Sequence, residues 1–364
     1  MKNISKGGNK MKHKKILFLV IVCLIIVCLN SNVYPCTTFC IKDNENIVFG
    51  RNLDFSIGFG HVIINKRNVT KTALVFPPEN PMTWTSKYGS ITFNQMGREF
   101  PYGGMNEAGL VIDQMWLNTT KYPELDDRYG LTELQWVQYQ LDNSATINDV
   151  IASDAQVRIS FQSYAPIHFL LCDKQGDMAT IEYIDGKFVY HKGKDLPITV
   201  LSNSTYEESV NFAKKFIEFG GNDTIPKTNK SLDRFALAAS MVKKFDESKS
   251  EDIIDYSYNI LYTVSQGEAT HWSIVYDIAN MKIYYKTYGN RKTRILNLED
   301  FNFSCETPVL ITDIENNIEN IEKDFIDYNT QLNKELIDNT LFMLNFLRTY
   351  PLKFEIQLLG IRSH

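Results

Sequence analysis

The sequence predicts one α+β domain with two β-sheets and helices outside them. Short apolar or alternating runs separated by turn residues dominate the chain, and helical periodicity is confined to a few longer segments. No internal repeat of about 20–50 residues and no Pro- or Ser-rich linker divides it. With 364 residues, of which 44% are hydrophobic and 22% charged, the chain can bury a large core.

The N-terminal region precedes this domain. Residues 1–15 carry six lysines and no acid, and residues 16–29 are an uninterrupted apolar run of 14 residues. This pattern is typical of a secretory signal, because 14 helical residues span about 21 Å and a membrane anchor needs roughly 30 Å. The bulky Val33, Tyr34 and Pro35 disfavour both lipidation of Cys36 and signal-peptidase cleavage directly before it. We expect residues 1–35 to form a signal peptide and a short propeptide, leaving no stable membrane anchor. The protein would be secreted or periplasmic, or lysosomal or extracellular in a eukaryote.

The first two predicted strands form a hairpin. Asp43-Asn44-Glu45-Asn46 is a tight turn signal, which places the start of the first strand beside Gly50-Arg51-Asn52-Leu53-Asp54. The predicted strands are 38–41, 47–49, 61–64, 72–76, 91–93, 110–115, 168–172, 178–183, 188–191, 199–201, 272–277 and 282–287.

Helices are predicted where apolar residues recur at helical spacing. These segments are 131–141, 147–153 with Thr146 as its N-cap, 207–219 and 232–245. Residues 314–350 also have helical periodicity and contain neither Pro nor Gly. We therefore expect a single domain over residues 36–364 that carries a helical C-terminal extension from about residue 314.

Several classes of function lack the residues they need. A formal charge of -5 gives no overall positive field to bind a phosphate backbone, so nucleic acid is not an expected partner. The chain has no phosphate-binding Gly-Lys-Ser/Thr loop, no His-Glu-x-x-His and no Gly-x-Ser-x-Gly. The internal histidines lack metal-ligand spacing and are expected to be structural: His61, His168, His191 and His271. We expect neither a metal nor another cofactor.

Cys36 stands out because it could become the first residue of the mature chain. The α-amine of an N-terminal cysteine has a pKa of about 7.7–8 and can take the proton of a thiol whose pKa is about 8.5. Arg51 could lower the thiol pKa, and Asp54 could hold the α-amine through a charge-assisted hydrogen bond.

The alternative is that these residues are structural, with a Cys36–Cys40 disulfide and an Arg51–Asp54 surface ion pair. Strand residues four apart are separated by about 13 Å, beyond the disulfide limit of roughly 7 Å between Cα atoms. The disulfide therefore fails if the strand prediction holds. We expect Cys172 and Cys305 to be free, buried thiols.

Four motifs in order resemble the choloylglycine hydrolase family of N-terminal-nucleophile amidases, which includes bile salt hydrolases and penicillin V acylases. The similarity runs from Cys36 to about residue 313. Cysteine followed by Arg and Asp within Gly-Arg-Asn-x-Asp is the most specific part of it. The motifs are Cys36-Thr-Thr-Phe-Cys, Gly50-Arg-Asn-Leu-Asp-Phe, Gly104-Met-Asn-Glu-Ala-Gly-Leu and Leu201-Ser-Asn-Ser.

The resemblance implies a four-layer αββα sandwich and a set of catalytic residues. It assigns Cys36 as the nucleophile, with Arg51 and Asp54 as its partners. It makes Asn203 an oxyanion-hole side chain, Asn118 a second donor through its backbone N–H, and Arg234 a late active-site arginine. Asn118 and Asn203 also head Asn-x-Thr sequons and could be surface glycosylation sites. Arg234 could be a solvated helix residue.

The resemblance also implies hydrolysis of linear amide C–N bonds in a small N-acylated substrate. Bile salt conjugates, penicillin V, N-acyl homoserine lactones and N-acylethanolamines all fit this description. Aromatic residues near the motifs could line an acyl pocket or belong to the core: Phe55, Phe59, Trp84, Tyr88 and Trp116. The sequence leaves homo-oligomerisation open. The alternatives are a non-catalytic secreted binding protein on the same fold and an acyltransferase that uses the same thioester.

Overall fold

The computed structural model describes residues 36–245 and 252–343. The chain divides into two units, Met1–Tyr34 and Pro35–His364, and the described residues belong to the second. The expected signal peptide and propeptide, residues 1–35, lie outside the described residues, as do positions 344–350 of the expected C-terminal helix. None of the helices in the described segments combines the length and apolar character needed to cross a bilayer.

One sheet carries the N-terminal hairpin. Its strand order is β14-β1-β2-β15-β16-β17, and all neighbouring strands are antiparallel. The strands are β1 (Thr37–Asp43), β2 (Asn46–Asp54), β14 (Val200–Leu201), β15 (Thr270–Asp277), β16 (Lys282–Thr287) and β17 (Arg294–Asn297). The two central positions of this six-stranded sheet therefore belong to β2 and β15.

The second large sheet has nine antiparallel strands in the order β13-β12-β11-β8-β7-β6-β3-β18-β19. They are β3 (His61–Asn65), β6 (Ser90–Asn94), β7 (Pro101–Asn106), β8 (Val111–Trp116), β11 (Ile167–Cys172), β12 (Met178–Ile184), β13 (Lys187–Lys192), β18 (Leu310–Asp313) and β19 (Ile326–Asp327). Two small sheets pair β4 (Thr70–Thr72) with β5 (Thr83–Thr85) and β9 (Tyr129–Leu131) with β10 (Val157–Ile159).

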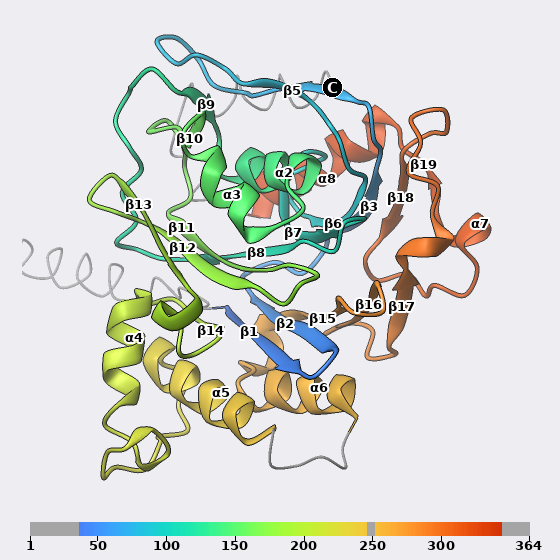
Figure 1. Ribbon diagram of the computed structural model, residues 1–364. Helices are drawn as coiled ribbons and strands as arrows, with labels where there is room; N and C mark the ends of the chain where they lie inside the picture. The colour runs from blue at the N-terminus through green and yellow to red at the C-terminus, as the bar shows by residue number, and fades with distance from the viewer. Residues whose placement is uncertain (1–35, 246–251, 344–364) are drawn as a thin grey trace, which may run out of the picture. The chain divides into compact units, whose positions relative to one another are not determined.

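Helices cover the outer faces of both large sheets (Figure 1). On the six-stranded sheet lie α4 (Tyr206–Ala213), α5 (Ser231–Phe245) and α6 (Ile253–Thr263). On the nine-stranded sheet lie α2 (Glu133–Asn143), α3 (Ile147–Ser153) and α8 (Thr330–Met343), and the short α7 (Ile321–Asp324) lies near β18 and β19. The expected four-layer αββα sandwich is confirmed.

Aromatic side chains fill the space between the two sheets. Phe93 on β6 contacts Trp272, Tyr276 and Tyr285, which lie on β15 and β16 of the opposite sheet. Phe49 on β2 adds an edge-on contact with Tyr276. Burying each such ring contributes about 1.5–3 kcal/mol, so this cluster holds the two sheets face to face.

The predicted hairpin is confirmed, and its register positions the motif residues. Asp43 pairs with Asn46, so Asn44 and Glu45 form a two-residue turn in which Asn44 has a φ of 54°. Asparagine tolerates this left-handed conformation better than most residues. The Thr146 N-cap is also confirmed, as part of a capping box with Asp149 at the start of α3.

Other predicted elements differ in extent. β4 ends at Thr72, and the following backbone is held by side chains instead of a strand: Leu74 N–H donates to Gln135 and Phe76 N–H to Gln162. The helix predicted over 207–219 ends at Ala213, and a separate 3₁₀ turn follows at Ile217–Phe219. Within 314–350 the described part is not one helix, because β19 separates α7 from α8. The helix α6 was not predicted from the sequence, and neither was β7, in which two glycines interrupt the strand pattern. The short strands β5, β9, β10, β17 and β18 were not predicted either.

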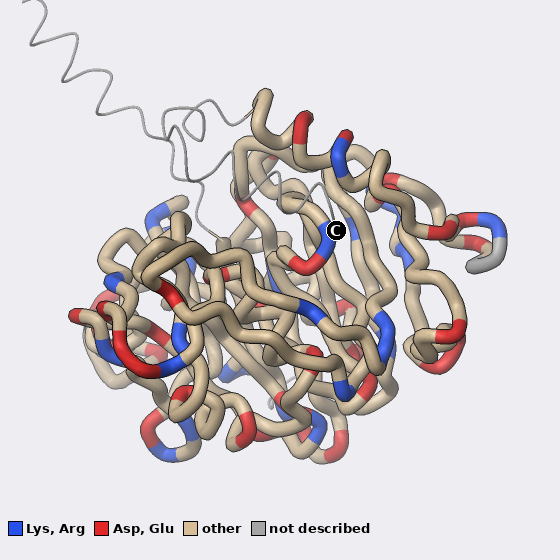
Figure 2. The backbone as a smooth tube through the Cα atoms, turned by 90° about the horizontal axis from the view of Figure 1, so that it is seen from above, with Lys and Arg blue, Asp and Glu red and all other residues tan. Residues whose placement is uncertain are grey.

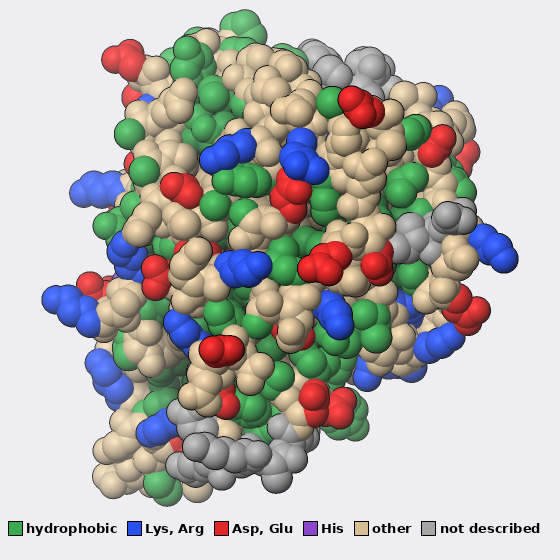
Figure 3. All heavy atoms as spheres, turned by 45° about the vertical axis from the view of Figure 1, so that its right-hand side comes forward, with side chains coloured by type: hydrophobic (Ala, Val, Ile, Leu, Met, Phe, Trp, Pro, Cys, Tyr) green, Lys and Arg blue, Asp and Glu red, His purple; other side chains and the backbone are tan. Residues whose placement is uncertain are grey.

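Charged residues of both signs lie interspersed over the described surface. Figure 2 shows Lys and Arg alternating with Asp and Glu along the peripheral loops, and the face in Figure 3 carries both signs among apolar side chains.

Candidate active site

The alternation of β2 sends the two charged motif residues to opposite faces of the sheet. Thr38 pairs with Arg51 and Thr37 with Asn52 in the β1–β2 ladder. Asn52 faces the helices, since its Nδ2 donates to the carbonyl of Leu261 in α6 at 2.7 Å. Arg51 therefore faces the nine-stranded sheet. Asp54, three residues further on, points to the helical side.

Cys36 lies directly before β1, at the end of the hairpin where both faces can be reached. Its side chain is buried, and its Sγ lies 3.8 Å from the backbone oxygen of Asp54, to which it donates. Burial raises the pKa of the Cys36 thiol, and the nearby Arg51 guanidinium opposes that rise. The thiol therefore needs a base within reach to lose its proton at neutral pH.

Arg51 is fully buried and forms its ion pair with Asp113 of β8, with 2.7 Å between Nε and Oδ1. The alternative of a surface ion pair between Arg51 and Asp54 is therefore wrong. Asp113 was not among the residues predicted from the sequence. An acid in the middle of a buried strand that is otherwise largely apolar was the available signal.

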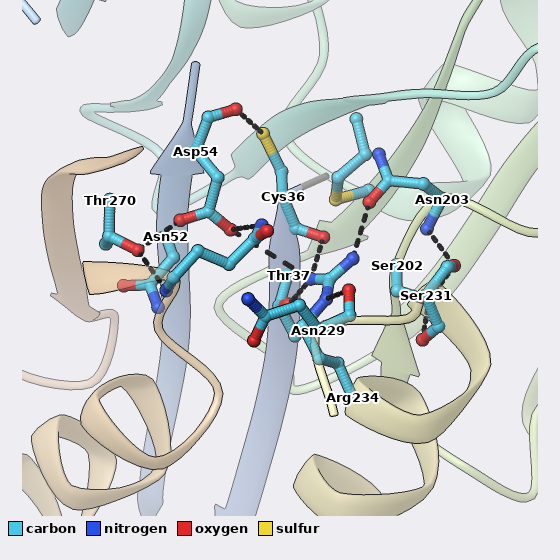
Figure 4. Close-up of polar contacts among 12 residues, drawn as sticks. Cys36, Thr37, Asn52, Asp54, Ser202, Asn203, Asn229, Ser231, Arg234 and Thr270 are labelled. Atoms are coloured by element: carbon cyan, nitrogen blue, oxygen red, sulfur yellow. Dashed lines mark hydrogen bonds and ion pairs between the residues drawn. The ribbon is translucent and has the colours of Figure 1, made fainter. Parts of the chain in front are cut away.

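Asp54 is held by three side chains on the helical side of the sheet (Figure 4). Thr270 Oγ1 donates to its Oδ1, Gln266 Nε2 donates to its Oδ2 at 3.0 Å, and Arg234 Nη1 lies 4.0 Å from Oδ2. Burial raises the pKa of Asp54 to about 6, and the positive charge of Arg234 opposes this. Gln266 precedes β15 and Thr270 is its first residue. No sequence motif identified either of them.

Arg234 links several of the motif residues. From the first turn of α5, its Nη1 donates to the carbonyl oxygen of Cys36 at 2.8 Å and to Thr37 Oγ1, and its Nη2 donates to Asn203 Oδ1 at 3.0 Å (Figure 4). Nε donates to the carbonyl of Asn229 at 3.2 Å. Only 1% of Arg234 is exposed, so the alternative of a solvated helix residue is wrong.

Asn203 follows β14 and is fixed at three atoms. Its backbone N–H donates to Ser231 Oγ at 2.9 Å, its Oδ1 accepts from Arg234, and its Nδ2 donates to the carbonyl of Trp116 at 2.8 Å. Because an amide nitrogen carries two hydrogens, one N–H of Nδ2 remains for another acceptor. Asn203 is half-buried, which disfavours a glycosylation site.

Asn118 lies two residues beyond Trp116, in the turn closed by Thr120 N–H and the carbonyl of Leu117 at 3.0 Å. Its side chain is exposed, and its Oδ1 accepts from Trp116 Nε1 at 2.6 Å. The contact between Trp116 and Asn203 brings this turn to the same end of the sheets. The exposed side chain leaves the glycosylation alternative open for Asn118.

The expected acyl-pocket aromatics separate into two groups. Phe55 is half-buried beside Asp54 and makes an edge-on contact with Tyr102, and the backbone carbonyl of Trp116 accepts a hydrogen bond from Asn203. These two lie at the site.

Phe59, Trp84 and Tyr88 have other surroundings. Phe59 lines a separate cavity of about 650 Å³. Trp84 is a core residue, because its Nε1 donates to Asp142 at 2.7 Å and its ring packs on Tyr139. The backbone N–H of Tyr88 donates to the carbonyl of Asp142.

The cysteines within the described residues are all free. Cys36, Cys40 and Cys172 are buried, which agrees with the rejection of a Cys36–Cys40 disulfide. Cys305 is exposed, so the expectation that it is buried is wrong. It lies in the turn after Phe303, where Ser304 and Thr307 bond to each other instead of covering it.

Known proteins of one family are similar to this chain in sequence. The profile of the linear amide C–N hydrolases, choloylglycine hydrolase family, matches residues 36–311. Penicillin V acylase of Pectobacterium atrosepticum is 34% identical over 184 residues, which are 46% of this chain and 48% of that protein. The chain thus matches about half the length of this curated relative.

Two solved structures resemble the fold. Penicillin V acylase from Agrobacterium tumefaciens superposes with a TM-score of 0.69 at 27% identity, covering 81% of this chain and 98% of that one. A mutant conjugated bile acid hydrolase from Clostridium perfringens superposes with a TM-score of 0.63 at 17% identity, covering 81% and 96%. Both have the N-terminal-nucleophile hydrolase fold. The chain belongs to the choloylglycine hydrolase family of linear amide C–N hydrolases.

Proposed function

We propose that this chain is an N-terminal cysteine amidohydrolase in which Cys36, once freed as the first residue, attacks the carbonyl carbon of an N-acyl amide. The contacts of Asp54 and Arg234 with Cys36, together with the contact of Arg234 with Asn203, support this most strongly. These residues come from β2, the end of β14 and α5, and the arginine touches both the cysteine and the asparagine.

The α-amine is the base that the site requires. Burial raises the pKa of the Cys36 thiol, and an α-amine with a pKa of about 7.7–8 lies on the same residue. In the full chain this nitrogen is an amide bonded to Pro35, which has no basic lone pair. Removal of residues 1–35 is therefore part of the proposal.

The proposed reaction has two stages. The thiol proton passes to the α-amine as the sulfur bonds to the carbonyl carbon, and the ammonium then gives this proton to the leaving nitrogen as the C–N bond breaks. Water attacks the resulting thioester, with its proton passing to the α-amine. Cleavage of the C–S bond releases the carboxylic acid, and the thiol recovers its proton.

Two donors are proposed for the tetrahedral oxyanion. One is the N–H of Asn203 Nδ2 that does not bond to Trp116, and the other is the backbone N–H of Asn118. Arg234 fixes the amide of Asn203 by occupying its oxygen, so only the nitrogen end can meet the substrate. Donors preorganised in this way supply much of the stabilisation in acyl transfer.

We infer that the acyl group is apolar, because Phe55 and Trp116 stand at the site. Penicillin V, whose linear amide carries an aromatic acyl group, is the first substrate to test, since two relatives are penicillin V acylases. Bile salt conjugates, N-acyl homoserine lactones and N-acylethanolamines complete the panel.

The test measures amide hydrolysis by protein whose N-terminus has been determined. Wild type beginning at Cys36 should hydrolyse at least one member of the panel. Cys36→Ala should not, while Cys305→Ala, which removes an exposed thiol, should retain wild-type rates.

Two outcomes would contradict the proposal. A correctly processed protein that binds the panel without turnover would favour the non-catalytic binding protein. Acyl transfer to an added amine that outruns hydrolysis in water would favour the acyltransferase.

We also propose that the protein is exported, because its N-terminal 29 residues carry the charge and apolar pattern of a secretory signal. Expression of the full chain should deposit mature protein in the periplasm or medium. Full-length protein retained in membranes would contradict this.

A further inference from the structure

A buried ion pair bridges the two sheets beneath Cys36. Arg51 on β2 and Asp113 on β8 approach to 2.7 Å between Nε and Oδ1, and both side chains are completely buried. Burying two charges is costly unless they pair well and their remaining polar atoms are satisfied. The contacts of Asp113 and of Arg51 therefore indicate the role of this ion pair.

The carboxylate of Asp113 is fixed by its neighbours. The backbone N–H of Gln114 donates to Oδ1 at 2.9 Å, and Tyr276 OH donates to Oδ2 at 3.5 Å. Gly103 is paired with Asp113 in the β7–β8 ladder, and a Cβ at Gly103 would lie 2.3 Å from Oδ2. Glycine at this position leaves the space that the carboxylate occupies.

The guanidinium of Arg51 lies near the Cys36 thiol, since each group shifts the pKa of the other. All three guanidinium nitrogens are buried, and none of them has a hydrogen-bond partner among the described residues. The 2.7 Å contact between Nε and Asp113 Oδ1 is therefore an ion pair without hydrogen-bond geometry. Because the guanidinium is planar and rigid, a carboxylate fixed beside Nε limits where the rest of the group can lie.

We propose that Asp113 is a positioning residue that holds the Arg51 guanidinium beside the Cys36 thiol. This inference rests on the proposed role of Cys36 as nucleophile. Asp113 is completely buried between the sheets, so it acts through Arg51 and has no contact with the substrate.

Asp113 influences the thiolate in two opposite ways, which makes the proposal testable by sign. As a negative charge near Cys36 it raises the thiol pKa, whereas Arg51 lowers it. If Asp113 were only a nearby charge, its removal would lower the thiol pKa. If Asp113 positions Arg51, removal of Asp113 lets the guanidinium move away from the thiolate and raises the thiol pKa.

The experiment measures the rate of Cys36 alkylation by iodoacetamide as a function of pH, read from the mass of the Cys36 peptide. It compares wild type, Asp113→Ala, Asp113→Asn and Gly103→Ala, with all N-termini determined. Glu79→Gln is the matched control, because Glu79 and Arg158 form another completely buried ion pair, at 2.6 Å. Thermal unfolding of each variant shows whether it is folded.

Asp113→Ala should raise the thiol pKa by about one unit, which slows alkylation at neutral pH about tenfold. Asp113→Asn keeps an oxygen and the side-chain volume beside Nε and should react faster than Asp113→Ala. Gly103→Ala displaces the carboxylate and should change the rate in the same direction as Asp113→Ala, so it serves if Asp113→Ala does not fold. Glu79→Gln should leave the thiol pKa unchanged.

A thiol pKa in Asp113→Ala equal to or below that of wild type would overturn the inference, as would an Asp113→Asn variant that reacts no faster than Asp113→Ala. On a hydrolysed substrate, Asp113→Ala should lower kcat with KM unchanged. Because alkylation needs no substrate, a shifted thiol pKa without amide turnover would contradict the proposed function alone. Turnover with unshifted thiol pKa and kcat would contradict only the role of Asp113.

Discussion

Arg234 donates from Nη2 to Oδ1 of Asn203 at 3.0 Å, and this contact decides which end of the Asn203 amide faces the proposed substrate. Without it the amide could present its oxygen, which would repel a developing oxyanion. The same guanidinium holds the Cys36 carbonyl, so one helix residue positions both the proposed nucleophile and the proposed oxyanion donor.

Arg234→Lys tests this double role. A lysine ammonium cannot reproduce the fork of donors, and each lost hydrogen bond to a charged group costs about 1.5–3 kcal/mol. We expect kcat/KM to fall about tenfold to a hundredfold. Arg294→Lys is the matched control, because Arg294 is also buried and donates to backbone carbonyls at another place in the sheet. An equal decrease of kcat/KM in Arg234→Lys and Arg294→Lys would show that replacing a buried arginine lowers the activity wherever it lies.

Asn203→Ala should lower kcat about 100- to 1000-fold, the usual cost of one oxyanion donor, with little change in KM. Steady-state kinetics on a hydrolysed panel member would measure this. Asn65→Ala serves as the control, since Asn65 is a buried asparagine that bonds to Ser90 and Thr92 of β6. A KM effect as large as the kcat effect would mean that Asn203 binds the ground state.

Maturation should depend on the Cys36 thiol. The signal peptidase is expected to cut upstream, near Ser31, and the thiol then attacks the Pro35 carbonyl. The C–N bond to Cys36 breaks as the α-nitrogen takes up the thiol proton, and water then hydrolyses the thioester, which releases the remaining residues and restores the thiol. Cys36→Ala should keep this short extension, and Pro35→Ala should lose it faster, as seen by intact mass and N-terminal sequencing. An active enzyme that still carried Tyr34 and Pro35 would refute the α-amine mechanism.

The activity should fall with acid as Asp54 takes up a proton. Burial raises the pKa of Asp54 to about 6, so its carboxylate is lost as the pH falls through that value. We expect the kcat/KM of wild type to decline below about pH 6, whereas the kcat/KM of Asp54→Asn should be low at all pH values.

The free energy of unfolding should change with pH in the opposite direction to the activity. Because the folded pKa lies above the unfolded value, the contribution of Asp54 is fully favourable below about pH 4 and is lost as the pH rises through about 6. Wild type should therefore gain stability relative to Asp54→Asn as the pH is lowered from about 7 to about 5. Denaturant unfolding measures this difference, and a pH-independent difference would exclude a raised pKa.

Gly50→Ala should destabilise the sheet. Gly50 faces Phe39 across the β1–β2 ladder, and a Cβ at Gly50 would lie 2.2 Å from the Phe39 ring. Overpacking of this kind costs about 1–3 kcal/mol. The double variant Gly50→Ala with Phe39→Leu should recover part of the loss in thermal unfolding, and no recovery would contradict the proposed clash.

The local pattern of the sequence determined the hairpin, most strands and the helix that begins after Thr146. These elements follow from alternation, turn residues and capping, which depend on neighbours within a few positions. The motif from Gly50 to Asp54 likewise placed Arg51 and Asp54 beside Cys36, because a two-residue turn leaves only one register. Residues 101–106 were not predicted because two glycines interrupt the strand pattern. Residues 253–263 were not predicted although their amphipathic spacing and the Asp252 N-cap are local signals of a helix.

Only the tertiary structure decided the partners of these residues. An odd spacing sends Arg51 and Asp54 to opposite faces of a strand, but the sequence does not say that Asp113 meets one and Arg234 the other. Each of these pairs joins segments more than fifty residues apart, so their meeting depends on how the sheets and helices pack. The same packing placed Trp84 in the core and exposed Cys305. The sequence determines which functional groups a residue carries, whereas the packing of the sheets and helices determines its burial and its partners.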